Sequence, residues 1–212
     1  MLDLTIRQLT FADVPRLIEI DAEFESDRFL DVEKTTNGLE VTWQLVERPL
    51  VPPFRSRYYS LNRQQRQEVG VRLQTGDGLY LAAEDTHTGK FIALLDMERE
   101  RWRDSAVVWN IMVDRAYRRK GLGRELVSRA VAWGRNLGLR GIVLETQTNN
   151  LAACHFYQAM GFKLCGIDDH FYSNDDTGAK EVAIFWWYEL DGSPSPVVRR
   201  GREPGGGVDS LH

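Results

Sequence analysis

Residues 105–137 read SAVVWNIMVDRAYRRKGLGRELVSRAVAWGRNL, and this stretch carries the strongest structural signals of the chain. Its first residues are mostly apolar and predict a strand. The loop RRKGLGR follows at 118–124, and then apolar residues recur every three or four positions, as on a helix that packs on a sheet. A strand that enters a glycine loop and then a helix directs backbone N–H groups and the positive end of the helix dipole at one place. Such a place favours an anion.

The composition of the loop suggests how an anion would be held. Gly121 and Gly123 lack a Cβ atom, so a phosphate can approach the main chain, while the four cations at 118, 119, 120 and 124 can neutralise it from the rim. The alternative is a charged turn in which the glycines only begin the helix and the cations are solvated. Isolated glycine patterns are often misleading, so the loop alone leaves both interpretations open.

Two nucleotide-binding motifs fit this loop poorly. A dinucleotide fingerprint needs a third glycine where Leu126 stands, although Glu145 lies about 20 residues further on, as that motif requires. A P-loop needs Gly-Lys-Ser or Gly-Lys-Thr at the start of the helix, and the sequence has Gly-Arg-Glu at 123–125. What remains is the pattern Arg118-x-x-Gly121-x-Gly123 behind an apolar strand.

The flanking sequence predicts an α/β protein with a mixed, mostly antiparallel sheet flanked by helices. LTIRQL at 4–9 predicts a strand, and Thr10 with Asp13 predicts a capped helix after it. Between residues 25 and 78 we expect a strand at 38–47 and set no firm boundaries. The other predicted elements are a hairpin of strands at 79–85 and 91–100 that turns at Gly89, strands at 141–146, 163–172 and 181–190, and a helix at 151–160 that ends at Gly161.

Length and composition limit the organisation of the chain. With 212 residues, of which 42% are hydrophobic, we expect one domain over residues 1–190. Residues 191–212 are rich in Gly, Pro and Ser, and we expect a mobile tail there, the alternative being a tail that docks on a partner subunit.

Charge and cysteine content bound the class of protein. A net charge of -4 gives no general attraction to nucleic acid, and no apolar run approaches the length that spans a bilayer. Two cysteines, Cys154 and Cys165, provide neither a disulfide framework nor a metal-ligand spacing. We therefore expect a cytoplasmic protein without a metal, nucleic-acid or membrane partner, and we leave a homodimer open.

A second motif lies one strand after the loop. It reads Asn150-x-x-Ala153-x-x-Phe156-Tyr157 and is followed by Gly-Phe at 161–162. The two motifs, in this order and at this separation, resemble those of the GNAT superfamily of N-acetyltransferases. LETQTNNLAACHFYQAMGF at 144–162 and AIFWWYEL at 183–190 further resemble the streptothricin acetyltransferase branch, which acetylates an amine of an antibiotic's β-lysine arm.

The resemblance implies a sheet splayed between its central strands, with acetyl-CoA bound across the splay as cosubstrate. The first motif would hold the coenzyme A pyrophosphate, the second would lie beside the pantetheine arm, and the strand edge around Met112 would pair with the pantetheine amides and hold the thioester oxygen. The residues expected at the acetyl-CoA site are Ile111, Met112, Val113, Arg118, Arg119, Lys120, Gly121, Leu122, Gly123, Arg124, Asn149, Asn150, Ala153 and Phe156.

The same resemblance places Tyr157 at the general-acid position, because a phenol keeps its proton at neutral pH and can give it to a leaving thiolate. Only one of two consecutive helical residues can face squarely into the core, so we expect Phe156 to be core and Tyr157 to face the site. Cys154 and His155 are also adjacent; they point about 100° apart and form no nucleophile pair.

The general base departs from the family pattern. Many members carry an acid on the strand before the loop, whereas this chain has Asn110, which cannot accept a proton. Glu145 and Glu98 are the candidates, acting directly or through a water molecule, and the alternative for each is a purely structural carboxylate.

The functional expectation is transfer of acetyl from acetyl-CoA to a primary amine in one ternary complex. The acceptor would be a small molecule such as a streptothricin-type or aminoglycoside-like antibiotic, which makes the protein an antibiotic-resistance acetyltransferase. The alternatives are the same fold acting on a protein N-terminus or a polyamine, and a non-catalytic acyl-CoA-binding module.

Overall fold

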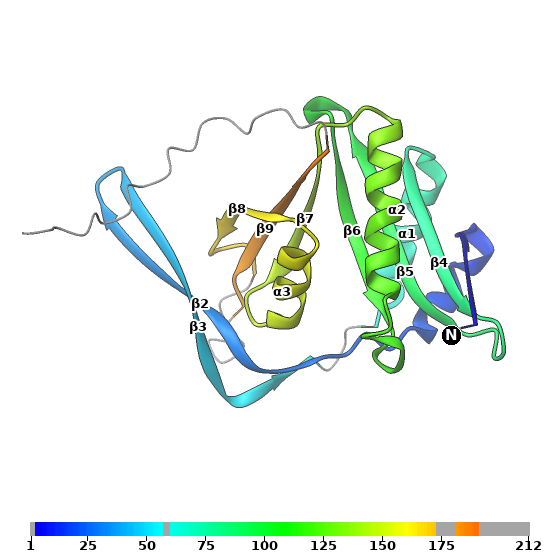
Figure 1. The fold of residues 1–212 in the computed structure, drawn as a ribbon, viewed down its shortest axis with the longest axis horizontal. Coiled ribbons are helices and arrows are strands. Elements are labelled where there is room, and N and C mark those ends of the chain that lie inside the picture. The colour runs from blue at the N-terminus through cyan, green and yellow to red at the C-terminus, as the bar shows by residue number, and fades with distance from the viewer. Residues whose placement is uncertain (1–2, 57–59, 173–180, 191–212) are drawn as a thin grey trace, which may run out of the picture.

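The fold is built on one large sheet, seen in a computed structural model that describes residues 3–56, 60–172 and 181–190. The sheet has the strand order β1-β4-β5-β6-β7-β9-β8 (Figure 1). Among its described strand pairs only β6 and β7 run parallel, which confirms the predicted mixed, mostly antiparallel sheet. Its strands are β1 Leu4–Gln8, β4 Gly78–Asp85, β5 Phe91–Glu100, β6 Ser105–Val113, β7 Gly141–Gln147, β8 Lys163–Asp168 and β9 Ala183–Glu189.

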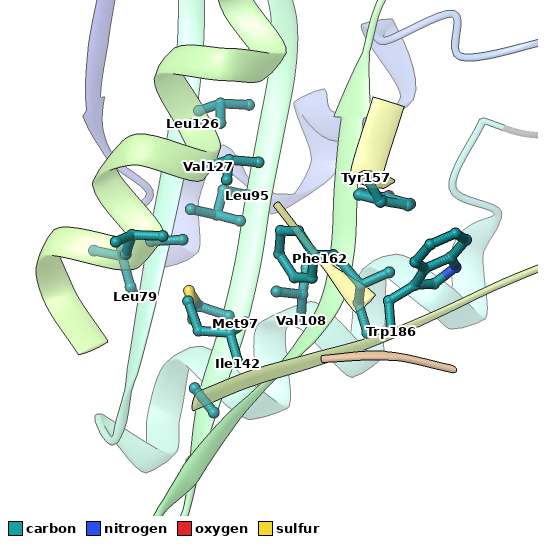
Figure 2. Packing of buried hydrophobic residues seen from close by; sticks show 14 of the residues in the cluster. Leu79, Leu95, Met97, Val108, Leu126, Val127, Ile142, Tyr157, Phe162 and Trp186 are labelled. Atoms are coloured by element: carbon teal, nitrogen blue, oxygen red, sulfur yellow. The ribbon is translucent and has the colours of Figure 1, made fainter. Parts of the chain in front are cut away.

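Helices cover both faces of this sheet. Helices α2 (Leu122–Asn136) and α3 (Leu151–Ala159) lie on one face, and α1 (Arg63–Thr75) and the 3-10 helix η1 (Phe11–Glu19) lie on the other (Figure 1). Two shorter 3-10 turns, η2 (Arg101–Arg103) and η3 (Arg115–Tyr117), flank β6. The larger apolar cluster fills the space under α2 and α3, and Figure 2 shows its residues from close by. A second cluster packs η1 and α1 against β4 and β5.

Helix α2 forms where the apolar spacing predicted it. Gly121 is the residue before its first turn and has φ = +89°, a backbone conformation that glycine adopts without strain. The helix ends before Gly138, whose φ is +66°. Its buried positions repeat at helical spacing and comprise Leu122, Leu126, Val127, Ala130, Val131 and Gly134. Each fully buried Leu or Val stabilises the fold by about 1.5–3 kcal/mol relative to an exposed one.

The central strands β6 and β7 separate partway along their length. They pair from Ser105–Gly141 to Val108–Leu144 and no further, although both strands continue. At this level β6 carries a bulge, because Val108 and Asn110 pair with consecutive residues of β5 and leave Trp109 as the extra residue. A bulge bends its strand and increases the local twist, so β6 turns away from β7 (Figure 1). This divergence is the splay that the family resemblance implies.

Residues 25–55 form a long hairpin outside the main sheet, with strands β2 (Glu25–Asn37) and β3 (Glu40–Arg55). The hairpin runs past β9 and β8 (Figure 1) and is tied to the end of β7, where the Leu30 N–H donates to the Thr148 carbonyl at 3.0 Å. Our expected strand at 38–47 is correct in place and too short. Strand β2 and helix α1 were not predicted, since β2 is charged and α1 buries only Val69 and Gly70, so neither shows a clear apolar stripe.

The end of the chain differs in its boundaries from the expectation. The strand predicted at 163–172 ends at Asp168, and residues 169–172 form a turn. The proposed tail at 191–212 lies outside the described residues. Within the described ranges no helix is long and apolar enough to cross a membrane.

Candidate active site

The splay leaves one edge of β6 open for a ligand. Beyond Val108 this strand pairs with β5 on one side, and no described strand pairs with its other side. Ile111 and Val113 pack toward the cluster under α2, while the Met112 side chain is buried in the cluster under η1 and α1. The side chains of these predicted contacts are therefore used in packing, and their main chain offers the N–H and C=O groups that an extended ligand could pair with.

The glycine loop follows the end of β6 that is not paired with β7 and leads into α2. Arg119 and Gly121 both have positive φ, at 63° and 89°, so the chain turns sharply into α2. Gly121 has no side chain that could accept from the first amides of the helix, and a Cβ built there would meet no atom within 4 Å. Amides at the start of a helix can bind an anion, so the anion cradle in RRKGLGR stays a prediction.

The side chains of the loop are partly used in holding it. The Arg118 Nε donates to the Val113 carbonyl at 3.1 Å and so ties the loop to the end of β6. The Lys120 Nζ lies 5.1 Å from the centre of the Tyr117 ring, whose hydroxyl donates to Asp85 at 2.7 Å and lowers the pKa of that carboxyl to about 2. Arg118 and Lys120 thus help to order the loop. Leu122 turns its side chain into the core.

Alanine at Gly121 tests the main-chain cradle and has a matched control at Gly138. Both glycines have positive φ and open space around the missing Cβ, so both substitutions add the same kind of backbone strain, about 1–2 kcal/mol. We expect both variants to lose similar thermal stability and only Gly121→Ala to bind acetyl-CoA about tenfold more weakly in calorimetric titration. Equal acetyl-CoA affinity of the two variants would contradict the cradle.

The turn from β7 into α3 is built by two predicted residues. The Asn150 side chain caps α3 by accepting from the Ala153 N–H at 3.3 Å, and fully buried Asn149 donates to Glu181 at 3.4 Å. Ala153 and Phe156 are partly buried on one side of α3, and the Phe156 ring lies 3.2 Å from the position of a Cβ on Gly123. Phe156 therefore joins α3 to the glycine loop.

This placement corrects our expectation for the two adjacent aromatic residues. Tyr157 is only 7% exposed and shares the buried stripe of α3 with Leu151 and Cys154, while Phe156 is partly exposed beside the loop. The Tyr157 ring packs among aromatic neighbours, with centroids 5.7 Å from Phe162 and 6.2 Å from Trp186 (Figure 2). The expectation that Phe156 is the core residue of the pair is wrong, because spacing on a helix gives the angle between two residues and not which one faces the core. The site role of Tyr157 stays a prediction.

Glu145 stands at the point where the sheet opens. It is the first residue of β7 after the last β6–β7 pair, and its side chain lies on the face opposite Leu144, away from α2 and α3. Burial raises the pKa of its carboxyl, the charge of Glu181 raises it further, and a 2.6 Å hydrogen bond from the Tyr172 hydroxyl opposes both. A carboxylate with a raised pKa at the splay has the properties of a general base.

Glu98 is one strand further away and more heavily bonded. Its Oε2 accepts from the Trp109 indole at 3.1 Å, and its Oε1 lies 3.0 Å from the Thr75 hydroxyl and 3.2 Å from the Tyr80 hydroxyl, which the Arg72 carbonyl also approaches, at 2.7 and 2.8 Å. These groups come from α1, β4 and the β6 bulge. Glu98 therefore braces the bulge that opens the sheet.

Asn110 belongs to a buried ionic network that the sequence did not reveal. Its Nδ2 donates to Asp96 at 2.7 Å, and Arg72 binds the same carboxylate with two hydrogen bonds, at 3.1 and 2.6 Å. Asp96 is fully buried. Strand β6 thus lacks an acid at this position, and the acid of this region is Asp96 on β5, which forms an ion pair with Arg72 of α1. Arg72 and Tyr172 were both missed, since neither carries a motif and each lies at least 24 residues from its partner.

A sheet split between its central parallel strands, with a glycine loop that leads into a helix and a carboxylate at the split, defines a class of α/β proteins with an open central sheet. The model of the Acetyltransferase (GNAT) family matches residues 39–162, more than half of the chain. The chain belongs to the GNAT family.

Individual acetyltransferases are similar in sequence to parts of this chain. The chain is 41% identical over 92 residues to streptothricin acetyltransferase A of Bacillus subtilis, and 39% identical over 87 residues to a streptothricin acetyltransferase of Escherichia coli. These matches cover 43% and 41% of this chain, and they span about half of each relative, 53% and 50%. The chain is also 27% identical over 149 residues to the [Ribosomal protein bS18]-alanine N-acetyltransferase of Escherichia coli. This match covers 70% of this chain and 89% of that relative.

Two solved structures have the same architecture. A nourseothricin acetyltransferase superposes with a TM-score of 0.72 at 23% identity, over 89% of this chain and 99% of that one, and so shares the fold. A Bacillus anthracis protein, assigned as a streptothricin acetyltransferase and solved in complex with acetyl coenzyme A, superposes with a TM-score of 0.67 at 27% identity, over 88% of this chain and 99% of its own.

Proposed function

We propose that this protein is an acetyl-CoA-dependent N-acetyltransferase that acetylates a primary amine of a streptothricin-type antibiotic. The observation that carries the proposal is the opening after Val108–Leu144, where one edge of β6 has no described partner strand and Glu145 is the next residue of β7. The streptothricin acetyltransferases of Bacillus subtilis and Escherichia coli support the acceptor class.

Main-chain groups of the protein would provide most of the contacts to acetyl-CoA. The amides at the start of α2 would bind the pyrophosphate, and the cations of the loop would screen its remaining charge. The open edge of β6 at 111–113 would pair with the pantetheine amides in the manner of an added strand, and Ala153 and Phe156 would border the arm from α3. With acetyl-CoA bound in this way, its thioester would lie in the opening between β6 and β7.

The reaction requires one bond to form and one to break. The amine nitrogen attacks the thioester carbonyl carbon, a C–N bond forms, and the oxygen is stabilised by an N–H at or near Met112. Glu145 takes a proton from the nitrogen, directly or through water. The C–S bond then breaks, Tyr157 protonates the sulfur, and the products are the N-acetylated amine and free coenzyme A.

We assign the base role to Glu145 rather than to Glu98. Glu145 lies at the opening and its pKa is raised, which suits proton transfer near neutral pH. Glu98 accepts from the Trp109 indole of the bulge through Oε2, and two hydroxyls lie beside its Oε1, so that carboxylate has less room to receive a proton from a substrate.

An amine panel tests the proposal. Purified protein is incubated with acetyl-CoA and streptothricin, spermidine, an alanine-starting peptide or lysine, while free thiol and product masses are followed. We expect thiol release and a mass gain of one acetyl group with streptothricin. Preference for the peptide would favour the second candidate, N-terminal acetylation, which the bS18-alanine acetyltransferase similarity supports. Binding of acetyl-CoA without thiol release would favour a non-catalytic module.

A further inference from the structure

The Glu145 carboxylate has a partner from a segment that the family motifs do not include. Tyr172 lies in the turn after β8, 27 residues further along the chain, and its hydroxyl donates to Glu145 Oε1 at 2.6 Å. The same hydroxyl oxygen accepts from the Gln147 Nε2 at 2.8 Å. A phenol has one proton to donate. Since Gln147 donates to the oxygen, the Tyr172 proton is directed at Glu145.

This arrangement divides the two oxygens of the carboxylate. Oε1 is held by Tyr172, and no described residue hydrogen-bonds to Oε2. Glu145 and Gln147 are two residues apart on β7 and therefore share a face of the sheet, while the Phe171 ring packs against Phe185 of β9 at 5.9 Å and seats the turn on that face. Oε2 is thus the atom left to meet a substrate.

We propose that Tyr172 is a positioning residue for acetyl transfer, which holds Glu145 in one orientation at the splay and stabilises its ionised form. The proposal rests on the base role given to Glu145 above. It extends that role to a hydrogen-bonded chain of three residues, Gln147, Tyr172 and Glu145, built by strand β7 and the turn after β8.

The charges around Glu145 allow the role to be tested in two directions. Burial and the Glu181 charge favour the protonated acid, whereas the Tyr172 hydrogen bond favours the carboxylate. Among the described residues, Cys154 of α3, a thiol whose pKa burial raises to about 12, also interacts with the Glu145 charge. Removing the Tyr172 hydroxyl should therefore raise the pKa of Glu145, and neutralising Glu181 should lower it.

The experiment compares Tyr172→Phe, Glu181→Gln and a matched control, Tyr80→Phe, which removes a hydroxyl from Glu98 instead. Each protein is titrated by 13C NMR of its glutamate carboxyls, with the Glu145 signal assigned by Glu145→Gln. In parallel, kcat/KM for one amine is measured against pH, so the titration of the amine is common to all variants. Circular dichroism establishes that each variant is folded.

We expect the Glu145 titration and the acid limb of kcat/KM to move together, to higher pH in Tyr172→Phe and to lower pH in Glu181→Gln. On that limb Tyr172→Phe should be about tenfold slower than the wild type, with the difference vanishing at high pH. The control should leave the Glu145 titration unchanged.

Three results would overturn the proposal. The first is a Glu145 titration that does not move in Tyr172→Phe, and the second is a titration that moves while the acid limb of kcat/KM does not. The third is an acid limb that also moves in the control Tyr80→Phe. Absence of acetyl transfer by the wild type would instead count against the proposed function. The NMR titration would still decide whether Tyr172 controls the ionisation of Glu145.

Discussion

Replacing Arg72 with alanine is expected to lower the free energy of unfolding by about 3–5 kcal/mol, the cost of leaving a buried charge without its partner. The Asp96 side chain has no solvent exposure, and Arg72 supplies two of the hydrogen bonds that its carboxylate receives. Without Arg72, the charge keeps the Asn110 amide and loses its only neutralising ion pair among the described residues. Urea unfolding followed by circular dichroism would show a lower midpoint with an unchanged slope.

Arg101 provides the matched control. It pairs with Asp77 at 2.8 Å, but the two side chains are 73% and 35% exposed, so Arg101→Ala should cost no more than about 1 kcal/mol. Adding Asp96→Asn to Arg72→Ala should recover part of the lost stability, since the orphaned charge is then removed. Equal losses in Arg72→Ala and Arg101→Ala would show that the buried pair does not stabilise the fold.

The parts of this fold that the sequence predicted are those set by local signals. The stripe of α2, the helix-ending glycines Gly138 and Gly161, and the turn at Gly89 each depend on neighbouring residues, and all three predictions are confirmed. Helix α1 also carried a local signal that went unused. Asn62 and Gln65 form a capping box, in which each side chain accepts from the other residue's backbone N–H at 2.9 Å.

The parts that the sequence did not predict depend on which elements the fold brings together. The Arg72–Asp96 pair joins α1 to β5, and Tyr172 reaches Glu145 from a turn beyond β8. Neither contact follows from spacing. The β2–β3 hairpin is similar, because its strands pair mostly with each other and remain largely exposed, which removes the alternation that marks a half-buried strand.

Replacing Tyr157 with phenylalanine is expected to lower kcat about 10²-fold or more, while the KM for acetyl-CoA changes little. The ring is buried among Phe162 and Trp186, so phenylalanine should keep the packing and remove only the hydroxyl. If the hydroxyl protonates the leaving sulfur, its loss affects the collapse of the intermediate and not the binding of the cosubstrate. The basic limb of the kcat profile, which reports the acid, should also disappear.

Tyr188→Phe is the matched control, because Tyr188 packs on Phe162 at 5.2 Å on the same side of the sheet and has no assigned role in the reaction. Its kcat should stay within about twofold of the wild type. The burial of Tyr157 makes this comparison informative, since a buried aromatic residue could serve the core alone. If Tyr157→Phe kept its turnover and its basic limb, Tyr157 would be a core residue, and the leaving thiolate would have to take its proton from water or rest on the amides of β6.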